Sequence, residues 1–148
     1  MLVLKDEQAT LEVGRELGAL LRKGDKLALS GTLGAGKTTL ARGILAGQGY
    51  GEEVPSPTFA IVQQYEPPET RIPVAHVDLY RIEDQEEIPE LGLEDTLEFG
   101  AMIVEWPDRM PDNFWHDALR IELEIMGDGN RRLTWTAGDA WKDRWPQT

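Results

Sequence analysis

The sequence of 148 residues contains no cysteine, which excludes disulfides, thiolate metal sites and a cysteine nucleophile. It has no apolar run near the ~20 residues that a membrane-spanning helix needs. Its first residues have neither the basic flank nor the apolar stretch of a signal peptide. We therefore expect a cytoplasmic protein that does not bind a membrane.

Basic residues are scarce, with 15 Lys and Arg against 27 Asp and Glu, so the formal net charge is -12. Such a surface repels nucleic acid at long range. A simpler interpretation of the charge is that it only keeps the protein soluble. The one visible basic cluster is Arg131-Arg132, and no aromatic stacking motif of an RNA-binding module appears. We expect no useful binding of nucleic acid by the isolated chain.

Apolar periodicity and turn residues predict alternating helices and strands. In chain order we expect a helix over 6–22, a strand over 26–30, a helix over 37–47, strands over 59–65 and 72–78, a short acidic helix over 84–91, and strands over 101–105, 119–125 and 131–136. Asp6 is suited to begin the first helix and Gly24 to end it. The pattern predicts one α/β domain over residues 1–148, a mixed β-sheet flanked by helices, with no assignment for the tail 138–148.

A glycine-rich motif lies between the predicted strand 26–30 and the helix 37–47. The motif G-x-x-x-x-G-K-T comprises Gly31, Thr32, Leu33, Gly34, Ala35, Gly36, Lys37 and Thr38. Its glycines let backbone N–H groups approach a phosphate chain, and the helix that follows points its positive end at the phosphates. The motif arises by chance in well under ~1% of chains of this length, which argues against a plain glycine-rich turn.

The motif predicts a P-loop that binds a nucleoside triphosphate with Mg²⁺. Lys37 offers an ammonium to the β- and γ-phosphates, and the Thr38 hydroxyl is placed to ligate Mg²⁺. The chain has only two asparagines, Asn113 and Asn130, and neither lies in the Asn-Lys-x-Asp run of a guanine site. ATP is therefore the expected nucleotide. We expect the following residues to bind it: Gly34, Ala35, Gly36, Lys37, Thr38 and Thr39.

Two acidic residues end apolar strands and are candidates for catalysis. Asp78 follows Val-Ala-His-Val, and Glu105 follows Met-Ile-Val. P-loop proteins use such a strand-end acid to hold Mg²⁺ or its waters, and ligands bind at this edge of the sheet. Asp78 suits metal positioning, whereas Glu105 reaches further and suits either Mg²⁺ or the attacking water. The sequence does not rank them, and each is open to reading as a helix cap or a surface charge.

Three further residues have two interpretations each. Thr58 lies where a switch threonine senses the γ-phosphate, or else in a proline-stiffened turn. His76 is a candidate base, but its place inside a strand favours a core histidine or one that supports the site from behind. Trp106 directly follows Glu105, so it is either a neighbour of the site or a core residue.

Four motifs in order resemble the TsaE family of small bacterial ATPases, also called YjeE. The motifs are the run from Leu29 to Thr39, Pro55-Ser56-Pro57-Thr58-Phe59, His76-Val77-Asp78-Leu79-Tyr80-Arg81 and Glu105-Trp106-Pro107. The resemblance covers about residues 6 to 135. Each motif is weak alone except the P-loop, but the ordered set is specific. One departure is Thr32, where the family often has Asp.

The resemblance implies a role in making threonylcarbamoyladenosine beside the anticodon of tRNA, together with TsaB and TsaD. It implies that the chain hydrolyses ATP, that Thr58 is the switch threonine and that Asp78 and Glu105 are the acids of the magnesium site. It also implies that Thr10 lies near the adenine. Because of the charge balance, we expect no direct tRNA binding by this chain alone.

Two other functional classes fit a P-loop. A small-molecule kinase needs an acceptor pocket and a lid arginine, for which the scattered arginines are candidates. A nucleotide-dependent binding module needs the same cradle without turnover. Metabolite phosphorylation would identify the first, and the absence of phosphate release with partners present would identify the second.

Overall fold

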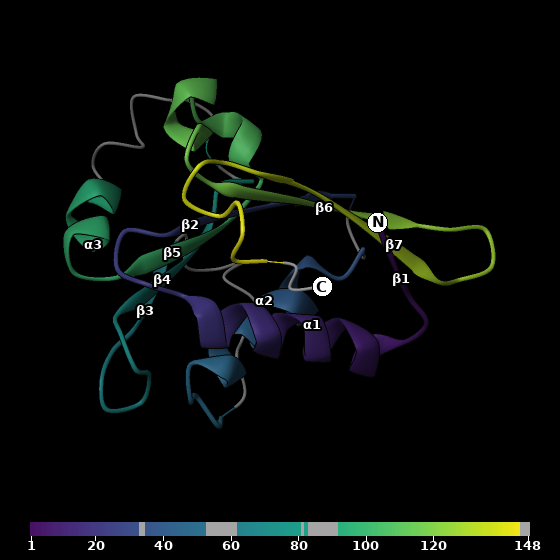
Figure 1. Ribbon diagram of the computed structural model, residues 1–148, viewed down its shortest axis with the longest axis horizontal. Coiled ribbons are helices and arrows are strands. Elements are labelled where there is room, and N and C mark those ends of the chain that lie inside the picture. Colours follow the sequence, from purple (N-terminus) through teal and green to yellow (C-terminus); the bar gives the residue numbers. More distant parts are fainter. Residues whose placement is uncertain (33–34, 53–61, 81, 83–91, 146–148) are drawn as a thin grey trace.

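A computed structural model describes the chain except residues 33–34, 53–61, 81, 83–91 and 146–148 (Figure 1). The strands are β1 (Leu2–Leu4), β2 (Lys26–Gly31), β3 (Val62–Tyr65), β4 (Val74–Asp78), β5 (Ala101–Glu105), β6 (Leu119–Ile125) and β7 (Arg131–Ala137). The α-helices are α1 (Glu7–Leu20), α2 (Lys37–Gly47) and α3 (Leu93–Phe99), and the short 3₁₀ helices are η2 (Pro107–Arg109) and η3 (Asp112–Trp115).

One seven-stranded sheet runs through the molecule in the order β1-β7-β6-β2-β5-β4-β3. The central strands β6, β2, β5 and β4 run parallel to one another, whereas β3, β7 and β1 pair antiparallel at the two sides. The predicted mixed α/β sheet flanked by helices is therefore confirmed. Because parallel strands are usually covered on both faces, their sequences are continuously apolar, as in β5.

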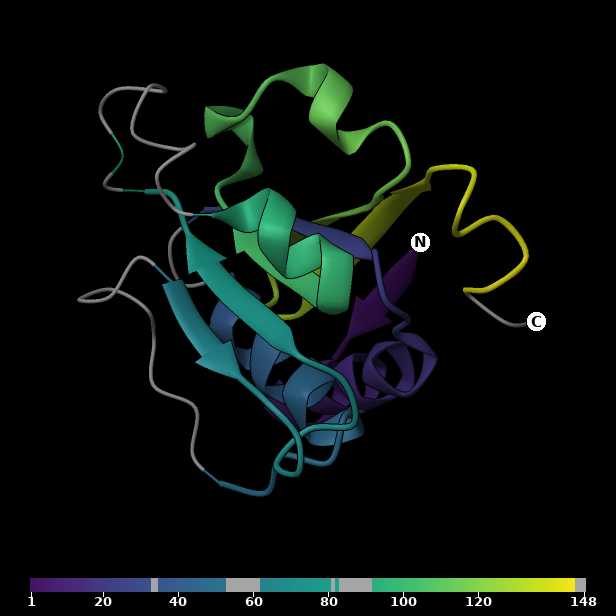
Figure 2. The same cartoon turned by 90° about the vertical axis from the view of Figure 1, so that its left-hand side faces the viewer.

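Two apolar cores cover the two faces of the sheet. The core on one face joins α1 and α2 to side chains such as Leu29 and Ile103. The core on the other face joins α3 and the 3₁₀ helices to Val77 and Val104. Figure 1 shows α1 and α2 beneath the sheet, and Figure 2 shows the same layers from the side. Among the described helices, none is long and apolar enough to cross a membrane.

Helices α1 and α2 pack backbone against backbone. A Cβ atom added to Gly18 would lie 2.0 Å from the carbonyl oxygen of Ile44, and one added to Gly14 would lie 2.6 Å from that of Leu40. Glycine is therefore required at both positions for the helices to approach this closely. The contact brings Thr10 of α1 beside the start of α2, within 4.0 Å of where a Cβ of Gly36 would lie.

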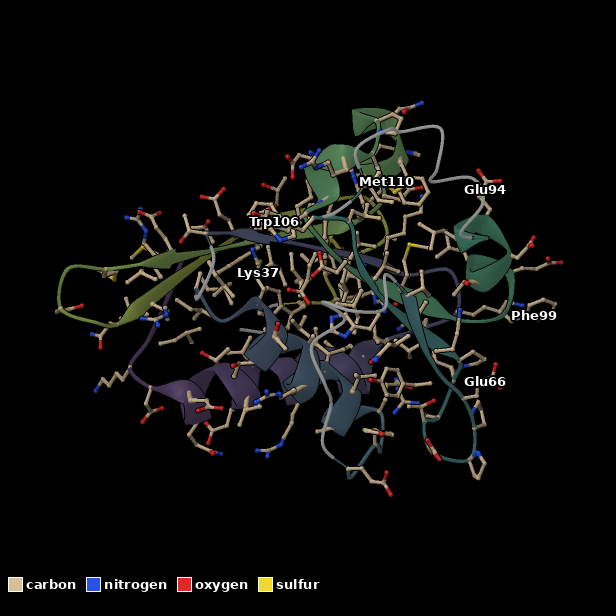
Figure 3. All side chains as sticks on the ribbon, turned by 180° about the vertical axis from the view of Figure 1, so that it is seen from behind. Lys37, Glu66, Glu94, Phe99, Trp106 and Met110 are labelled. Carbon is tan, nitrogen blue, oxygen red and sulfur yellow. The ribbon has the colours of Figure 1, made fainter. Side chains whose placement is uncertain are left out.

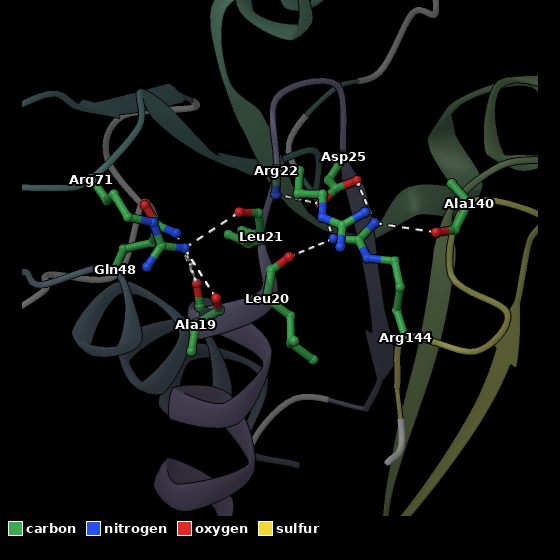
Figure 4. A network of polar contacts seen from close by, with 10 residues as sticks. Ala19, Leu20, Leu21, Arg22, Asp25, Gln48, Arg71, Ala140 and Arg144 are labelled. Carbon is green, nitrogen blue, oxygen red and sulfur yellow. Dashed lines mark hydrogen bonds and ion pairs between the residues drawn. The ribbon is translucent and has the colours of Figure 1, made fainter.

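The first helix differs from its prediction at its end. Asp6 caps it as expected, accepting a hydrogen bond from the Ala9 N–H at 2.8 Å. The helix stops at Leu20, however, and Gly24 lies in the turn beyond it. Arg71 donates to the carbonyls of Gly18, Ala19 and Leu21, which satisfies the helix end from a distant part of the chain (Figure 4).

The described part of the tail, residues 138–145, is fixed on the α1 side of the molecule. Arg144 binds both carboxylate oxygens of Asp25, at 3.0 and 2.8 Å, and donates to the Leu20 carbonyl (Figure 4). Trp141 and Trp145 are buried in the core that α1 and α2 share. The contacts of Arg144 with Asp25 and Leu20 join residues 119 and 124 positions apart, so the local sequence pattern did not indicate them.

Four described elements were not predicted, and several boundaries differ. The short strand β1, the helix α3 and the 3₁₀ helices η2 and η3 are absent from the sequence prediction, and the predicted helix 84–91 lies outside the described residues. Strand β4 begins at Val74 rather than residue 72. Strands β6 and β7 form a hairpin that turns over Gly127 to Asn130.

Candidate nucleotide and magnesium site

The carboxyl ends of three parallel strands meet beside the start of α2. The register pairs Asp78 of β4 with Glu105 of β5, and Glu105 with Leu29 of β2. Because alternate residues of a strand share a face, His76, Asp78 and Glu105 project toward the same side as Ile103, which packs in the α1 and α2 core. Both predicted acids therefore lie at the edge of the sheet where the glycine loop leaves β2.

Two glycines with positive φ, Gly31 and Gly36, flank the loop between β2 and α2. Gly31 has φ 146°, and a Cβ there would lie 2.5 Å from the Leu123 carbonyl oxygen. Gly36 is the N-cap of α2 with φ 107°, and no side chain caps this helix. Its first backbone N–H groups are thus left for a ligand, and an anion at this end also gains from the helix dipole.

Lys37 lies folded back against the protein. Its ammonium donates to the Gly31 carbonyl at 2.5 Å and lies 3.8 Å from the centroid of the Trp106 ring (Figure 3). Burial lowers the pKa of Lys37 from its usual value, while the nearby carboxylates of Glu105, Asp78 and Asp108 act to raise it. An anionic phosphate placed here would meet a partly desolvated cation, for which electrostatic attraction is strong.

Thr38 and Glu105 face each other across the gap between α2 and the sheet. The Thr38 hydroxyl lies 3.4 Å from Oε1 of Glu105. The other oxygen of that carboxylate, Oε2, lies 2.7 Å from Nε2 of His76, which is fully buried. Glu105 is itself buried, with a side chain 5% exposed. This arrangement supports the interpretation of His76 as a residue behind the site rather than a base within it.

Asp78 is held by backbone instead. Its Oδ1 accepts a hydrogen bond from the Tyr80 N–H at 2.9 Å, and the Tyr80 ring packs on Trp106 with centroids 4.9 Å apart. Burial raises the pKa of Asp78 above its usual value, the Tyr80 bond acts to lower it, and the negative charge of Glu105 raises it further. A carboxylate with a raised pKa is better suited to accept a proton from water.

A cleft of about 290 Å³ opens on the other side of the start of α2. It is lined by Leu4, Lys5, Asp6, Glu7, Thr10, Gly36, Thr39, Gly129 and Arg131. Thr10, which the resemblance places near the adenine, lines this cleft together with Thr39. Arg131 and Gly129 come from the β6–β7 hairpin, and nothing in their local sequence indicated a place at this cleft.

The oxygen donors at this edge suit Mg²⁺. Thr38 supplies a hydroxyl, and Asp78 and Glu105 supply carboxylates. These are hard oxygen ligands, and Mg²⁺ in nucleotide sites takes one or two carboxylates together with substrate phosphates. Within the part of the chain that the structure describes, no group of three or more His, Asp or Glu side chains is arranged to hold a metal ion by itself.

The structure brings together most of the residues that the sequence singled out. Lys37, Thr38, Asp78 and Glu105 converge on one edge of the sheet. Ala35 is fully buried beside the loop, and its N–H donates to the Thr32 carbonyl at 3.1 Å. Gly34 and Thr58 lie outside the described residues.

This architecture and its strand-to-helix glycine loop place the protein among P-loop NTPase-like α/β folds. The family model of the threonylcarbamoyl adenosine biosynthesis protein TsaE matches residues 4–133. The chain therefore belongs to the TsaE family.

Curated relatives agree with this assignment. The TsaE protein of Bacillus subtilis (strain 168) is 36% identical over 131 residues, which span 88% of this chain and 80% of the relative. The TsaE protein of Streptomyces coelicolor is 40% identical over 119 residues, spanning 79% of this chain and 80% of the relative. The crystal structure of Bacillus subtilis YdiB matches with a TM-score of 0.74 and 30% identity, covering 92% of this chain and 83% of that one.

Proposed function

We propose that this chain binds Mg²⁺ and ATP at the edge formed by Lys37, Thr38, Asp78 and Glu105. We further propose that it hydrolyses ATP to ADP and phosphate in the cytoplasm. In this role it would act with TsaB and TsaD, as a subunit required for threonylcarbamoyladenosine modification of tRNA. The observation that carries it is the convergence of an ammonium, a hydroxyl and two strand-end carboxylates at an uncapped helix start. The names of the matched family and of its relatives, which refer to threonylcarbamoyladenosine biosynthesis, support the tRNA pathway.

The two carboxylates have different surroundings, and this suggests different tasks. Glu105 faces the Thr38 hydroxyl, so we assign both to Mg²⁺. Bound Mg²⁺ neutralises phosphate charge during phosphoryl transfer. Asp78 is adjacent, and burial raises its pKa, so we assign it to the attacking water. Lys37 turns from the Gly31 carbonyl to the phosphates, and Thr10 and Thr39 border the base.

The kinase alternative is weakened by the contacts of its candidate arginines. Arg71 donates to the end of α1, Arg132 forms an ion pair with Glu124, and Arg109 donates to the Tyr80 carbonyl. A lid arginine instead has to swing over the transferred phosphate. Hydrolysis with water as acceptor therefore fits these described arginines better than transfer to a metabolite.

Phosphate release in the presence of purified TsaB and TsaD tests the proposal. The wild type is expected to release phosphate from ATP, and Glu105→Ala and Asp78→Ala are expected to fold yet lose this activity because each carboxylate serves the site and not the core. Glu94→Ala, at an exposed acid on α3, is the matched control and should retain it. Wild-type rates in either site variant would refute the role assigned to that residue, and phosphorylation of a metabolite would favour the kinase.

A further inference from the structure

A histidine is fully buried in the middle of strand β4. His76 is 0% exposed and lies opposite Ile103 in the parallel pairing of β4 with β5. An imidazole in such a place is costly unless its nitrogens are hydrogen-bonded. One nitrogen, Nε2, lies 2.7 Å from Oε2 of Glu105, and the two side chains contact each other away from water.

The chemistry of the pair fixes the direction of this hydrogen bond. An ionised carboxylate only accepts, so Nε2 of His76 carries the hydrogen and donates it to Glu105. The second nitrogen, Nδ1, is buried and has no hydrogen-bond partner among the described residues. Among the described residues, the hydrogen bonding of this imidazole is therefore directed at Glu105 alone.

The hydrogen bond from His76 gives the two carboxylate oxygens of Glu105 different surroundings. His76 holds Oε2, and Oε1 is left facing the Thr38 hydroxyl at 3.4 Å. A glutamate has three side-chain torsions, and a buried one without a partner would turn to satisfy its charge elsewhere. Asp78 is oriented through its Oδ1 instead, which accepts a hydrogen bond from the backbone N–H of Tyr80.

We propose that His76 is a positioning residue that holds Glu105 with a single oxygen presented toward the Mg²⁺ site. The proposal rests on the function proposed above, because it assumes that Mg²⁺ binds between Thr38 and Glu105. Partners behind a metal ligand fix its orientation, and losing one typically costs about 10- to 100-fold in metal affinity or activity. His76 touches neither nucleotide nor metal in this account.

The test measures the Mg²⁺ requirement separately from nucleotide binding. Binding of a non-hydrolysable ATP analogue is followed by calorimetry across a Mg²⁺ titration and again without Mg²⁺. In His76→Leu the Mg²⁺ concentration for half-maximal effect should rise roughly 10- to 100-fold, while the affinity without Mg²⁺ stays near wild type. His76→Gln, whose amide Nε2 can donate to Glu105, should recover most of the loss.

A stability control separates positioning from a general weakening of the sheet. Ile103→Val removes a buried methylene group from the residue that lies opposite His76 and leaves the hydrogen bond to Glu105 intact. It should lower the urea midpoint and keep the wild-type Mg²⁺ requirement. If Ile103→Val shifts the Mg²⁺ requirement as His76→Leu does, the positioning role is wrong. It is also wrong if His76→Gln folds but does not restore the wild-type Mg²⁺ requirement.

Two outcomes distinguish this inference from the function beneath it. If wild-type protein binds the analogue without any Mg²⁺ effect, the proposed magnesium site itself fails, and the role of His76 fails with it. If wild type shows the Mg²⁺ effect and His76→Leu has the same requirement, only the positioning role is overturned.

Discussion

The Lys37 ammonium lies 3.8 Å from the centroid of the Trp106 ring and donates a hydrogen bond to the Gly31 carbonyl. A cation over an indole face is held by the ring quadrupole, more strongly where water is excluded. The cation that should bind phosphate is thus held by protein groups in this structure. Binding of a nucleotide requires it to leave at least part of this contact, which changes the surroundings of the indole.

Trp106 should therefore report nucleotide binding by its fluorescence. In Trp106→Phe, most of the fluorescence change on adding ADP should disappear, because the indole beside Lys37 is the one whose contacts change. Trp135→Phe is the matched control, since Trp135 is also partly buried but packs against Trp145 in the tail. An equal change in wild type and Trp106→Phe would assign the signal to another tryptophan.

Asp78→Asn should stabilise the nucleotide-free protein, and more so at neutral than at acid pH. Burial raises the folded-state pKa of Asp78 above its ordinary value of 3.8, so the folded state holds this proton more tightly than the unfolded state. The resulting loss of folding stability is absent below the ordinary pKa. It grows as the pH rises from the ordinary pKa through the raised pKa of the folded state. Asparagine keeps an oxygen to accept from the Tyr80 N–H without the charge.

Urea unfolding of both proteins at pH 4.5 and 7.5 checks this. The free-energy difference in favour of Asp78→Asn should be larger at pH 7.5. A difference that is larger at pH 4.5, or a variant less stable than wild type at pH 7.5, would contradict the sign of the pKa shift.

Arg144→Ala should lower stability by roughly 3–5 kcal/mol, because it leaves the buried carboxylate of Asp25 without its ion-pair partner. The two side chains are 13% and 6% exposed. Lys142→Ala is the matched control, since the Lys142–Asp139 pair in the same tail is exposed and should contribute little. Thermal or urea midpoints decide it: equal effects of the two substitutions would mean that the tail does not clamp the end of α1.

The isolated chain should not bind tRNA usefully. Its net charge is -12, and affinity for RNA comes largely from Lys and Arg displacing counterions at phosphates. Direct binding of tRNA would have to use the Arg131-Arg132 cluster, but Arg132 pairs with Glu124 and Arg131 donates to the Gly129 carbonyl. Gel shifts at low salt should show binding only with the partner proteins added. Tight binding by the chain alone would instead mean that this protein recognises tRNA directly and does not reach it by docking on partner proteins.

The sequence predicted the placement of the candidate site residues better than it predicted the edges of the fold. Lys37, Thr38 and the two strand-end acids come together because a P-loop and a parallel sheet impose their positions locally. A neighbour of Lys37 that is distant in sequence is Trp106, whose ring lies against the ammonium and whose backbone adopts φ 62° after β5. Such a conformation is rare outside glycine, and no sequence pattern marks it.

Other misses come from contacts between distant segments. The end of α1 is set by Arg71 and Arg144 rather than by Gly24, and neither arginine is near it in sequence. Strand β1 has three residues, and it pairs with β7 from the other end of the chain. A strand that short has too few residues to show a period of two.

The most direct test of the account is the affinity for Mg²⁺ and ATP in wild type and Lys37→Ala. Removing the partly desolvated phosphate-binding cation should weaken binding by roughly 3–5 kcal/mol, which is about 100-fold or more. Lys26→Ala is the matched control: the Lys26 ammonium also donates to a backbone carbonyl and lies over an aromatic ring, that of Phe114, away from the glycine loop. Calorimetry should show that loss in Lys37→Ala alone, and near-unchanged affinity in Lys37→Ala would contradict the nucleotide site.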